Sequence, residues 1–159
     1  MTTFTVPWLE NLALATSEFD DDHRRLLDQV NRLLVAVSSR DQTRVLMAFG
    51  SFKAAAQEHF AAEEAQMRDS RYPDSEKHCK SHRHLLDSLI SLQFTLNNTE
   101  RFGSTTGPYV FLERWFVAHL TNDDKRFAEF MARRAADAAS QTYPVHATGG
   151  PTAEVRAEP

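Results

Sequence analysis

The chain has 159 residues, of which 42% are hydrophobic and 25% are charged, a composition typical of one soluble globular domain. Its net charge of −4 argues against nucleic acid as a main partner, because phosphate binding needs a basic surface. No apolar run approaches the roughly 20 residues that span a bilayer, and we expect no signal peptide. The single cysteine, Cys79, excludes an intramolecular disulfide, so we expect a cytoplasmic location.

The N-terminal part of the chain predicts an arm followed by a helix. Residues 1–18 are expected to lie across the rest of the molecule and pack Trp8 against it, since Pro7 disfavours a long helix there. Acidic residues crowd the region near Asp20, where they suit the start of a helix. From His23 onward, apolar residues recur with a period near 3.6. Asp41, after a polar break, is a candidate N-cap for the next helix.

The second and third predicted helices carry histidines on their apolar stripes. The second has the near-heptad series Val45, Phe49, Phe52, Ala56, His59, Glu63 and Met67. A break containing Pro73 follows. The third helix has the series His78, His82, Leu85, Leu89, Leu92 and Leu96. Each helix therefore places two metal-ligand side chains one turn apart on its buried face.

A fourth helix is predicted after a loop from Asn97 to Gly107, with Pro108 at its first position. Its series is Leu112, Trp115, Phe116, His119, Asp123, Asp124, Phe127 and Phe130. The chain is thus predicted to be all-α: an antiparallel up-down-up-down four-helix bundle with an N-terminal arm. We assign residues 1–138 to the bundle and residues 139–159, which contain His146, to a disordered C-terminal tail.

The histidines of all four helices are expected to meet in one layer near one end of the bundle, since a helix rises about 1.5 Å per residue. Such a buried set of imidazoles and carboxylates, with no Lys or Arg on the same stripes, would be very costly without a cation. Imidazole plus carboxylate without thiolate suits iron, zinc, manganese or copper. Five imidazoles and two carboxylates are too many for one ion, so the sequence predicts a dinuclear centre.

Helix geometry leaves the second carboxylate open. Asp123 is four residues after His119 and shares its face, whereas Asp124 points about 140° away on a regular α-helix. Two other candidates are rejected on the same ground. His84 lies about 160° from the His82 face and is expected to be exposed, and Cys79 lies about 100° from His78.

Four motifs make residues 8–130 resemble the hemerythrins, and most closely their single-domain bacterial members. Trp8, Leu12 and the run Phe-Asp-Asp-Asp-His at 19–23 resemble the family's arm and first ligand. The later motifs are His59-Phe-x-x-Glu63-Glu64-x-x-Met67, Tyr72-Pro73 followed by His78-x-x-x-His82, and Trp115-x-x-x-His119-Leu120-x-x-x-Asp124-Lys125. Ala15, Phe19 and Asp22 depart from the residues common in the family, but none is a ligand.

The resemblance implies a non-haem di-iron centre with an oxo or hydroxo bridge. His78, His82 and His119 would bind one iron, and His23 and His59 the other, which keeps an open position for dioxygen. Glu63 and Asp124 would bridge the two ions, so the family's spacing selects Asp124 over Asp123. Four apolar neighbours of the ligands are expected to line a dry dioxygen pocket: Phe60, Trp115, Phe116 and Leu120.

The function that this resemblance implies is reversible dioxygen binding for carriage, storage or delivery, by a monomer that is not an enzyme. Three alternatives stay open from the sequence: an oxygen or redox sensor, a di-iron enzyme that consumes peroxide or nitric oxide, and a bundle that holds zinc for stability alone. No further acid or base is evident near the ligands, which argues against an oxygenase. The sequence identifies no protein partner.

Overall fold

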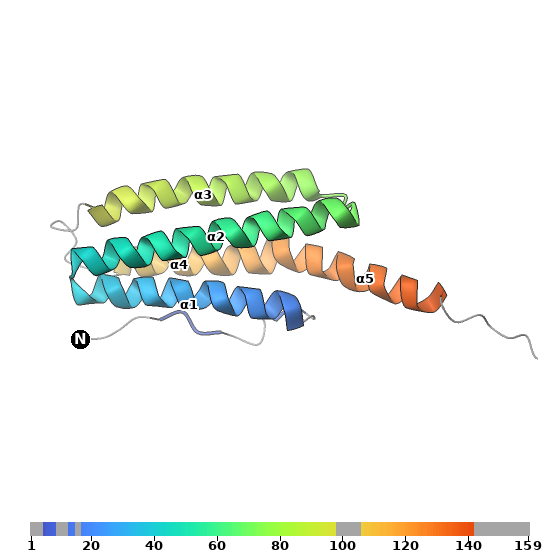
Figure 1. Cartoon of the computed structure of the whole chain (residues 1–159), viewed down its shortest axis with the longest axis horizontal. Coiled ribbons are helices and arrows are strands. Elements are labelled where there is room, and N and C mark those ends of the chain that lie inside the picture. The colour runs from blue at the N-terminus through green and yellow to red at the C-terminus, as the bar shows by residue number, and fades with distance from the viewer. Residues whose placement is uncertain (1–4, 9–12, 15–16, 98–105, 142–159) are drawn as a thin grey trace, which may run out of the picture.

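The computed structural model describes residues 5–8, 13–14, 17–97 and 106–141 of the chain. These residues form α1 (Ser17–Ser39), α2 (Gln42–Ser70), α3 (Ser75–Asn97), α4 (Thr106–His119), the π-helical turn η3 (Leu120–Asp124) and α5 (Lys125–Gln141). The segments α4, η3 and α5 continue one another as a single rod, which packs antiparallel to its neighbours (Figure 1). The described part of the chain contains no strand. The predicted all-α four-helix bundle is confirmed.

The helix ends follow local sequence signals. The Asp41 side chain caps α2 by accepting a hydrogen bond of 3.1 Å from the backbone N–H of Arg44, as predicted. Arg71 ends α2 in the left-handed conformation with φ 55°, and its N–H bonds back to the carbonyl of Arg68. At the N-terminus, α1 begins at Ser17, slightly earlier than the acidic cluster near Asp20 suggested.

Two apolar clusters pack inside the bundle, and a polar layer lies between them. The larger cluster contains fully buried side chains from α1, α2, α3 and α4, including Val30, Leu33, Phe52, Leu89, Leu112 and Phe116. The smaller one consists of Met67, Tyr72 and Phe127, with Phe19, Phe130 and others packed against it. Along α2, Glu63 separates Phe60 of the first cluster from Met67 of the second. The fold therefore encloses this glutamate between two dry regions.

The N-terminal arm lies against α1 (Figure 1). The backbone N–H of Val6 donates to Oδ1 of Asn31 at 2.7 Å, and Nδ2 of Asn31 donates to the Val6 carbonyl at 3.0 Å. The guanidinium of Arg24 stacks 4.8 Å from the centre of the Trp8 ring, and Trp8 packs against the larger cluster. The arm prediction is confirmed for the arm residues that the structure describes.

At the other end, α5 continues to Gln141, so residues 139–141, which the sequence predicts as part of the disordered tail, are helical. The α5 residues from Ala132 to Ser140 are exposed. The remaining residues of the predicted tail, with His146, lie outside the described part of the chain. Every described helix is too short or too polar to cross a bilayer.

We predict that Asn31→Ala destabilises the protein by about 1–2 kcal/mol, because the two backbone groups of Val6 lose their partners. Urea unfolding measures the loss, and hydrogen exchange should show the Val6 amide unprotected. The exposed Gln57→Ala on α2 is the control and should change stability little. An Asn31→Ala variant as stable as the Gln57→Ala variant would contradict the proposed anchoring.

Candidate metal centre

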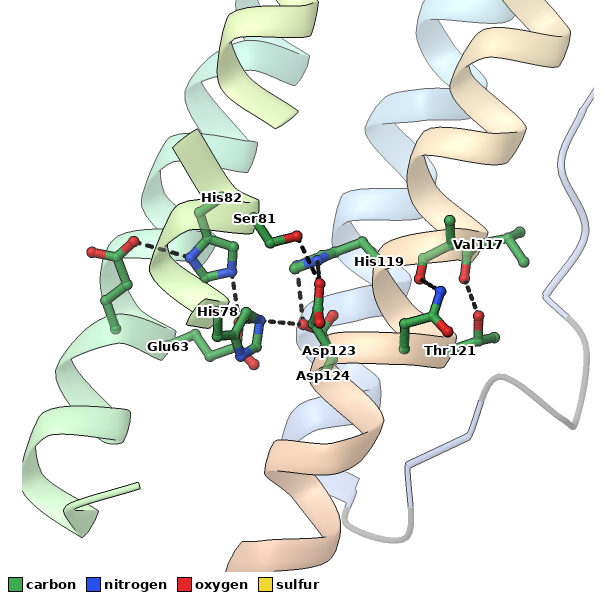
Figure 2. Close-up of polar contacts among 12 residues, drawn as sticks. Glu63, His78, Ser81, His82, Val117, His119, Thr121, Asp123 and Asp124 are labelled. Atoms are coloured by element: carbon green, nitrogen blue, oxygen red, sulfur yellow. Dashed lines mark hydrogen bonds and ion pairs between the residues drawn. The ribbon is translucent and has the colours of Figure 1, made fainter. Parts of the chain in front are cut away.

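Seven side chains capable of metal ligation converge in the polar layer. They come from α1, α2, α3 and the continuous rod of α4, η3 and α5. Figure 2 shows Glu63, His78 and His82 facing His119 and Asp124 across the bundle interior. The full set is His23, His59, Glu63, His78, His82, His119 and Asp124. All are buried except His59, which is half-buried. The structure thus brings together every residue of the predicted ligand set.

Asp124 lies at the centre of this set and is completely buried. Its Oδ1 atom is 2.9 Å from Nε2 of His119 and 3.1 Å from Nε2 of His78. Its Oδ2 atom is 3.1 Å from Nε2 of His23 on α1. The two oxygens of one carboxylate therefore face two different groups of imidazoles, which is the arrangement that a bridging carboxylate requires.

A π-helical turn places Asp124 on the same side as His119. Over η3 the N–H of Lys125 bonds to the carbonyl of Leu120, five residues back. This wider turn brings a residue five positions along the chain back to nearly the same face. The expectation from a regular α-helix, that Asp123 rather than Asp124 follows His119 on the inner face, is wrong for this reason. Asp123 instead accepts a hydrogen bond of 2.6 Å from the Ser81 hydroxyl.

Two groups of donors can be distinguished, and they share Asp124. In the first group, Oε2 of Glu63 is 3.2 Å from Nε2 of His82 and 3.5 Å from Nε2 of His78. Together with His119 and Asp124 these residues can each offer one ligand atom within 4.8 Å of all the others. The second group meets the same condition with three residues, His23, His59 and Asp124.

The donor set lacks the partners that buried polar atoms need. Ten buried side-chain nitrogen and oxygen atoms have no hydrogen-bond partner among the described residues, and all ten belong to the seven converging side chains. An unpaired buried polar group costs about 1–3 kcal/mol, and more when charged. Divalent cations would satisfy these lone pairs and compensate the two carboxylates. The residues present therefore fit a pair of metal ions with imidazole and carboxylate ligands.

The protonation of the site suits metal binding. Burial, with further effects from His23 and other neighbours, lowers the pKa of His59 from 6.5 to about 3, so its imidazole is neutral and has a free lone pair at ordinary pH. Burial would raise the pKa of Asp124, but the imidazoles of His119, His23 and His78 outweigh burial and hold that pKa well below its usual value. Asp124 is therefore a carboxylate.

Four apolar residues that we expected to line a dioxygen pocket are all buried: Phe60, Trp115, Phe116 and Leu120. Phe60 stacks on His82 with ring centres 4.1 Å apart and an interplanar angle of 14°. Its centre is also 5.1 Å from that of His119. Trp115 lies behind Phe60 and donates its indole N–H to the carbonyl of Leu85. A direct role of these residues in binding dioxygen stays a prediction.

A cleft of about 330 Å³ between α1 and α2 reaches His59. Its walls include the charged side chains of Asp22, Arg25 and Glu58. Arg25 donates to Asp22 at 2.9 Å across the exposed face of α1. None of the four expected pocket residues lines this cleft. The side of the centre that contains His59 is therefore approached past both charged and apolar side chains.

Sequence reasoning missed one close neighbour of the centre. Oε1 of Glu64 lies 3.0 Å from Nδ1 of His82, on the side of that ring away from Glu63. Glu64 belongs to the motif that begins at His59, and its position one residue after Glu63 was the only signal available. His84 is exposed as expected, and Cys79 is a half-buried free thiol.

Comparison with known proteins agrees with this geometry. The model of the hemerythrin family, described as the hemerythrin HHE cation binding domain, matches residues 14–131. A bacteriohemerythrin from Stenotrophomonas maltophilia (strain R551-3) is 25% identical to the chain over 122 residues. That alignment covers 77% of this chain and 78% of the relative.

We predict that Asp124→Asn lowers the metal content of the purified protein below two ions per chain, because a neutral amide is a poor bridge between cations. Asp123→Asn should retain the metal content of the unmodified chain, since Asp123 bonds to Ser81. Elemental analysis of both variants, loaded and dialysed together, measures the difference. Loss of metal from Asp123→Asn alone would contradict the assignment.

Removal of the metal should destabilise the fold, because it leaves the buried donor atoms unpaired. With free metal at about 100 times its Kd, one bound ion adds about 2.7 kcal/mol to the free energy of unfolding. Denaturant titration with and without chelator measures this increment. His78→Ala should reduce the increment, whereas His84→Ala at an exposed position should preserve it. Equal unfolding midpoints with and without metal would refute the prediction.

Proposed function

Since the chain belongs to the hemerythrin family, we propose that it binds dioxygen reversibly at a non-haem di-iron centre, for oxygen carriage, storage or delivery. His78, His82 and His119 would hold one iron, His23 and His59 the other, and Glu63 and Asp124 would bridge them. The bound irons would supply the electrons that reversible dioxygen binding requires. A cytoplasmic monomer stays our prediction.

The observation that carries this proposal is the unequal number of donors around the shared carboxylate. Among the described residues, five surround one position, whereas His23, His59 and Asp124 alone form the other group. Even if the second oxygen of Glu63 is added to the group of His23, His59 and Asp124, that group has fewer ligands than the other. An ion held there keeps room for an external ligand, which a purely structural site would not need.

The chain's own residues contribute positioning and partial exclusion of water. Phe60 packs against the rings of His82 and His119 and fills the space on that side of the centre. Phe127 covers the opposite side, with its ring centre 6.5 Å from that of His78. The cleft beside His59 is the approach that a small molecule would use. Access therefore falls on the side with fewer donors.

The charged side chains in the cleft support one alternative, an enzyme that consumes a small oxidant such as peroxide or nitric oxide. Charged groups at Asp22, Arg25 and Glu58 allow water to approach His59. Water and protons that reach the centre would favour irreversible oxidation of irons held there. Reversible carriage and oxidant consumption therefore differ in whether the irons return to the reduced state once oxygen is removed.

The proposed function is tested by exposing the diferrous protein to air and then removing the oxygen. Carriage predicts a visible charge-transfer band that appears in air and disappears on deoxygenation, over repeated cycles. Rapid oxidation after which deoxygenation restores nothing would exclude carriage and favour the enzyme, which turnover assays with peroxide and nitric oxide would then identify.

The role of the cleft is tested by Ala62→Trp, which places an indole in its wall. We expect the rate of azide binding to the diferric protein to fall at least about tenfold, an estimate that corresponds to about 1.4 kcal/mol in the barrier. Ala61→Trp, on the neighbouring exposed position of α2 outside the cleft, is the matched control. Stopped-flow spectroscopy measures both rates. Equal rates in the two variants would mean that ligands enter by another route.

A further inference from the structure

His82 is held between two consecutive glutamates of α2. Its Nε2 atom faces Oε2 of Glu63 inside the centre at 3.2 Å. Its Nδ1 atom faces Oε1 of Glu64 at 3.0 Å. The Glu63 carboxylate is buried, whereas the side chain of Glu64 is 30% exposed. The two glutamates therefore occupy different environments and contact opposite sides of one imidazole.

We propose that Glu64 is a positioning residue of the metal centre. Its carboxylate accepts a hydrogen bond from Nδ1–H of His82, which leaves the lone pair on Nε2 directed at the metal. A neutral imidazole carries one proton, and its partner decides which nitrogen holds it. A carboxylate on Nδ1 also makes Nε2 a stronger donor. Phe60 stacked on the His82 ring limits rotation of the imidazole, but stacking alone does not select the tautomer.

The surroundings of Glu64 support this role. The Glu64 carboxylate also lies near the half-buried Cys79 thiol of the facing helix α3. Two side chains of α3, the Cys79 thiol and the His82 imidazole, thus lie near one carboxylate of α2. The pairing of α2 and α3 therefore places the Glu64 carboxylate beside the His82 ring.

The contact is specific to one side of the centre. Nδ1 of His23, in the poorer donor group, has no hydrogen-bond partner among the described residues. On the richer side, Oδ2 of Asp123 lies 4.0 Å from Nδ1 of His119, too far for a hydrogen bond, and is held by Ser81. Glu64 is therefore the one carboxylate hydrogen-bonded to the outer nitrogen of a ligand among the described residues. Its effect should fall on the ion bound by His82.

The first test compares Glu64→Ala, Glu64→Gln and the control Asp69→Asn, which removes a charge from an exposed position of the same helix. Nuclear magnetic resonance of isotope-labelled histidine in the metal-free protein reports the His82 tautomer. We expect the Nδ1–H form in the unmodified chain, in Glu64→Gln, which keeps an acceptor oxygen, and in Asp69→Asn. Glu64→Ala should lose this preference. An unchanged tautomer in Glu64→Ala would overturn the proposal.

The second test measures Co²⁺ affinity of the same proteins by competition with a chelator. Loss of such a partner typically weakens metal binding 10–100-fold, and we expect this range for Glu64→Ala and a smaller loss for Glu64→Gln. Mössbauer spectra of the iron-loaded variant should change for one of the two irons. Affinity within twofold of the unmodified chain, or an equal change at both irons, would overturn the proposal.

This inference rests on the proposed metal centre but not on dioxygen binding. A chain that binds Co²⁺ normally yet fails to bind dioxygen reversibly would overturn the proposed function and leave the role of Glu64 intact. A chain that binds dioxygen and is indifferent to Glu64→Ala would overturn only the inference. Because the Glu64 side chain is partly exposed, circular dichroism should show both variants folded.

Discussion

The structure depends on a carboxylate, Asp124, buried completely among three imidazoles from three helices. Such a group in a dry interior is tolerated only where its charge and lone pairs are compensated. His78 makes a hydrogen bond to Asp124, and Nε2 atoms of His23 and His119 lie within 3.1 Å of it, yet ten buried atoms of the set have no hydrogen-bond partner among the described residues. The layer of buried ligands around Asp124 therefore lacks a compensating positive charge. This feature, more than the fold itself, indicates that the protein binds metal.

The rest of the bundle supports that layer. The larger apolar cluster gives the helices enough buried surface to offset a costly polar interior, and the smaller cluster closes the layer from the other end. The enclosure is uneven, because His59 borders a cleft while its partners are sealed. The donor group with fewer residues, which contains His59, is also the one that the cleft reaches. This coincidence is the basis for our proposal that a small exogenous ligand binds at the centre.

The sequence predicted the layer of ligands because histidines interrupt otherwise apolar stripes, and a stripe is a pattern that one chain displays by itself. It did not predict the π-helical turn, since nothing in Leu120–Asp124 distinguishes that backbone from an α-helix, and the position of Asp124 depends on that turn. Family resemblance supplied Asp124 without the physical reason. Glu64 was missed because it lies off the stripe, where its contact with His82 depends on the pairing of α2 and α3. The cleft was missed as well, because it exists only where α1 and α2 pack against each other.

Crystallography of the iron-loaded protein with anomalous diffraction at the iron edge tests the central claim most directly. The account predicts two iron peaks, separated by about the 3.5–4 Å typical of paired metal sites, with one oxygen of Asp124 directed at each. One peak should lie among His78, His82 and His119, and the other beside His23 and His59. A single iron, or two irons of which only one contacts Asp124, would contradict it.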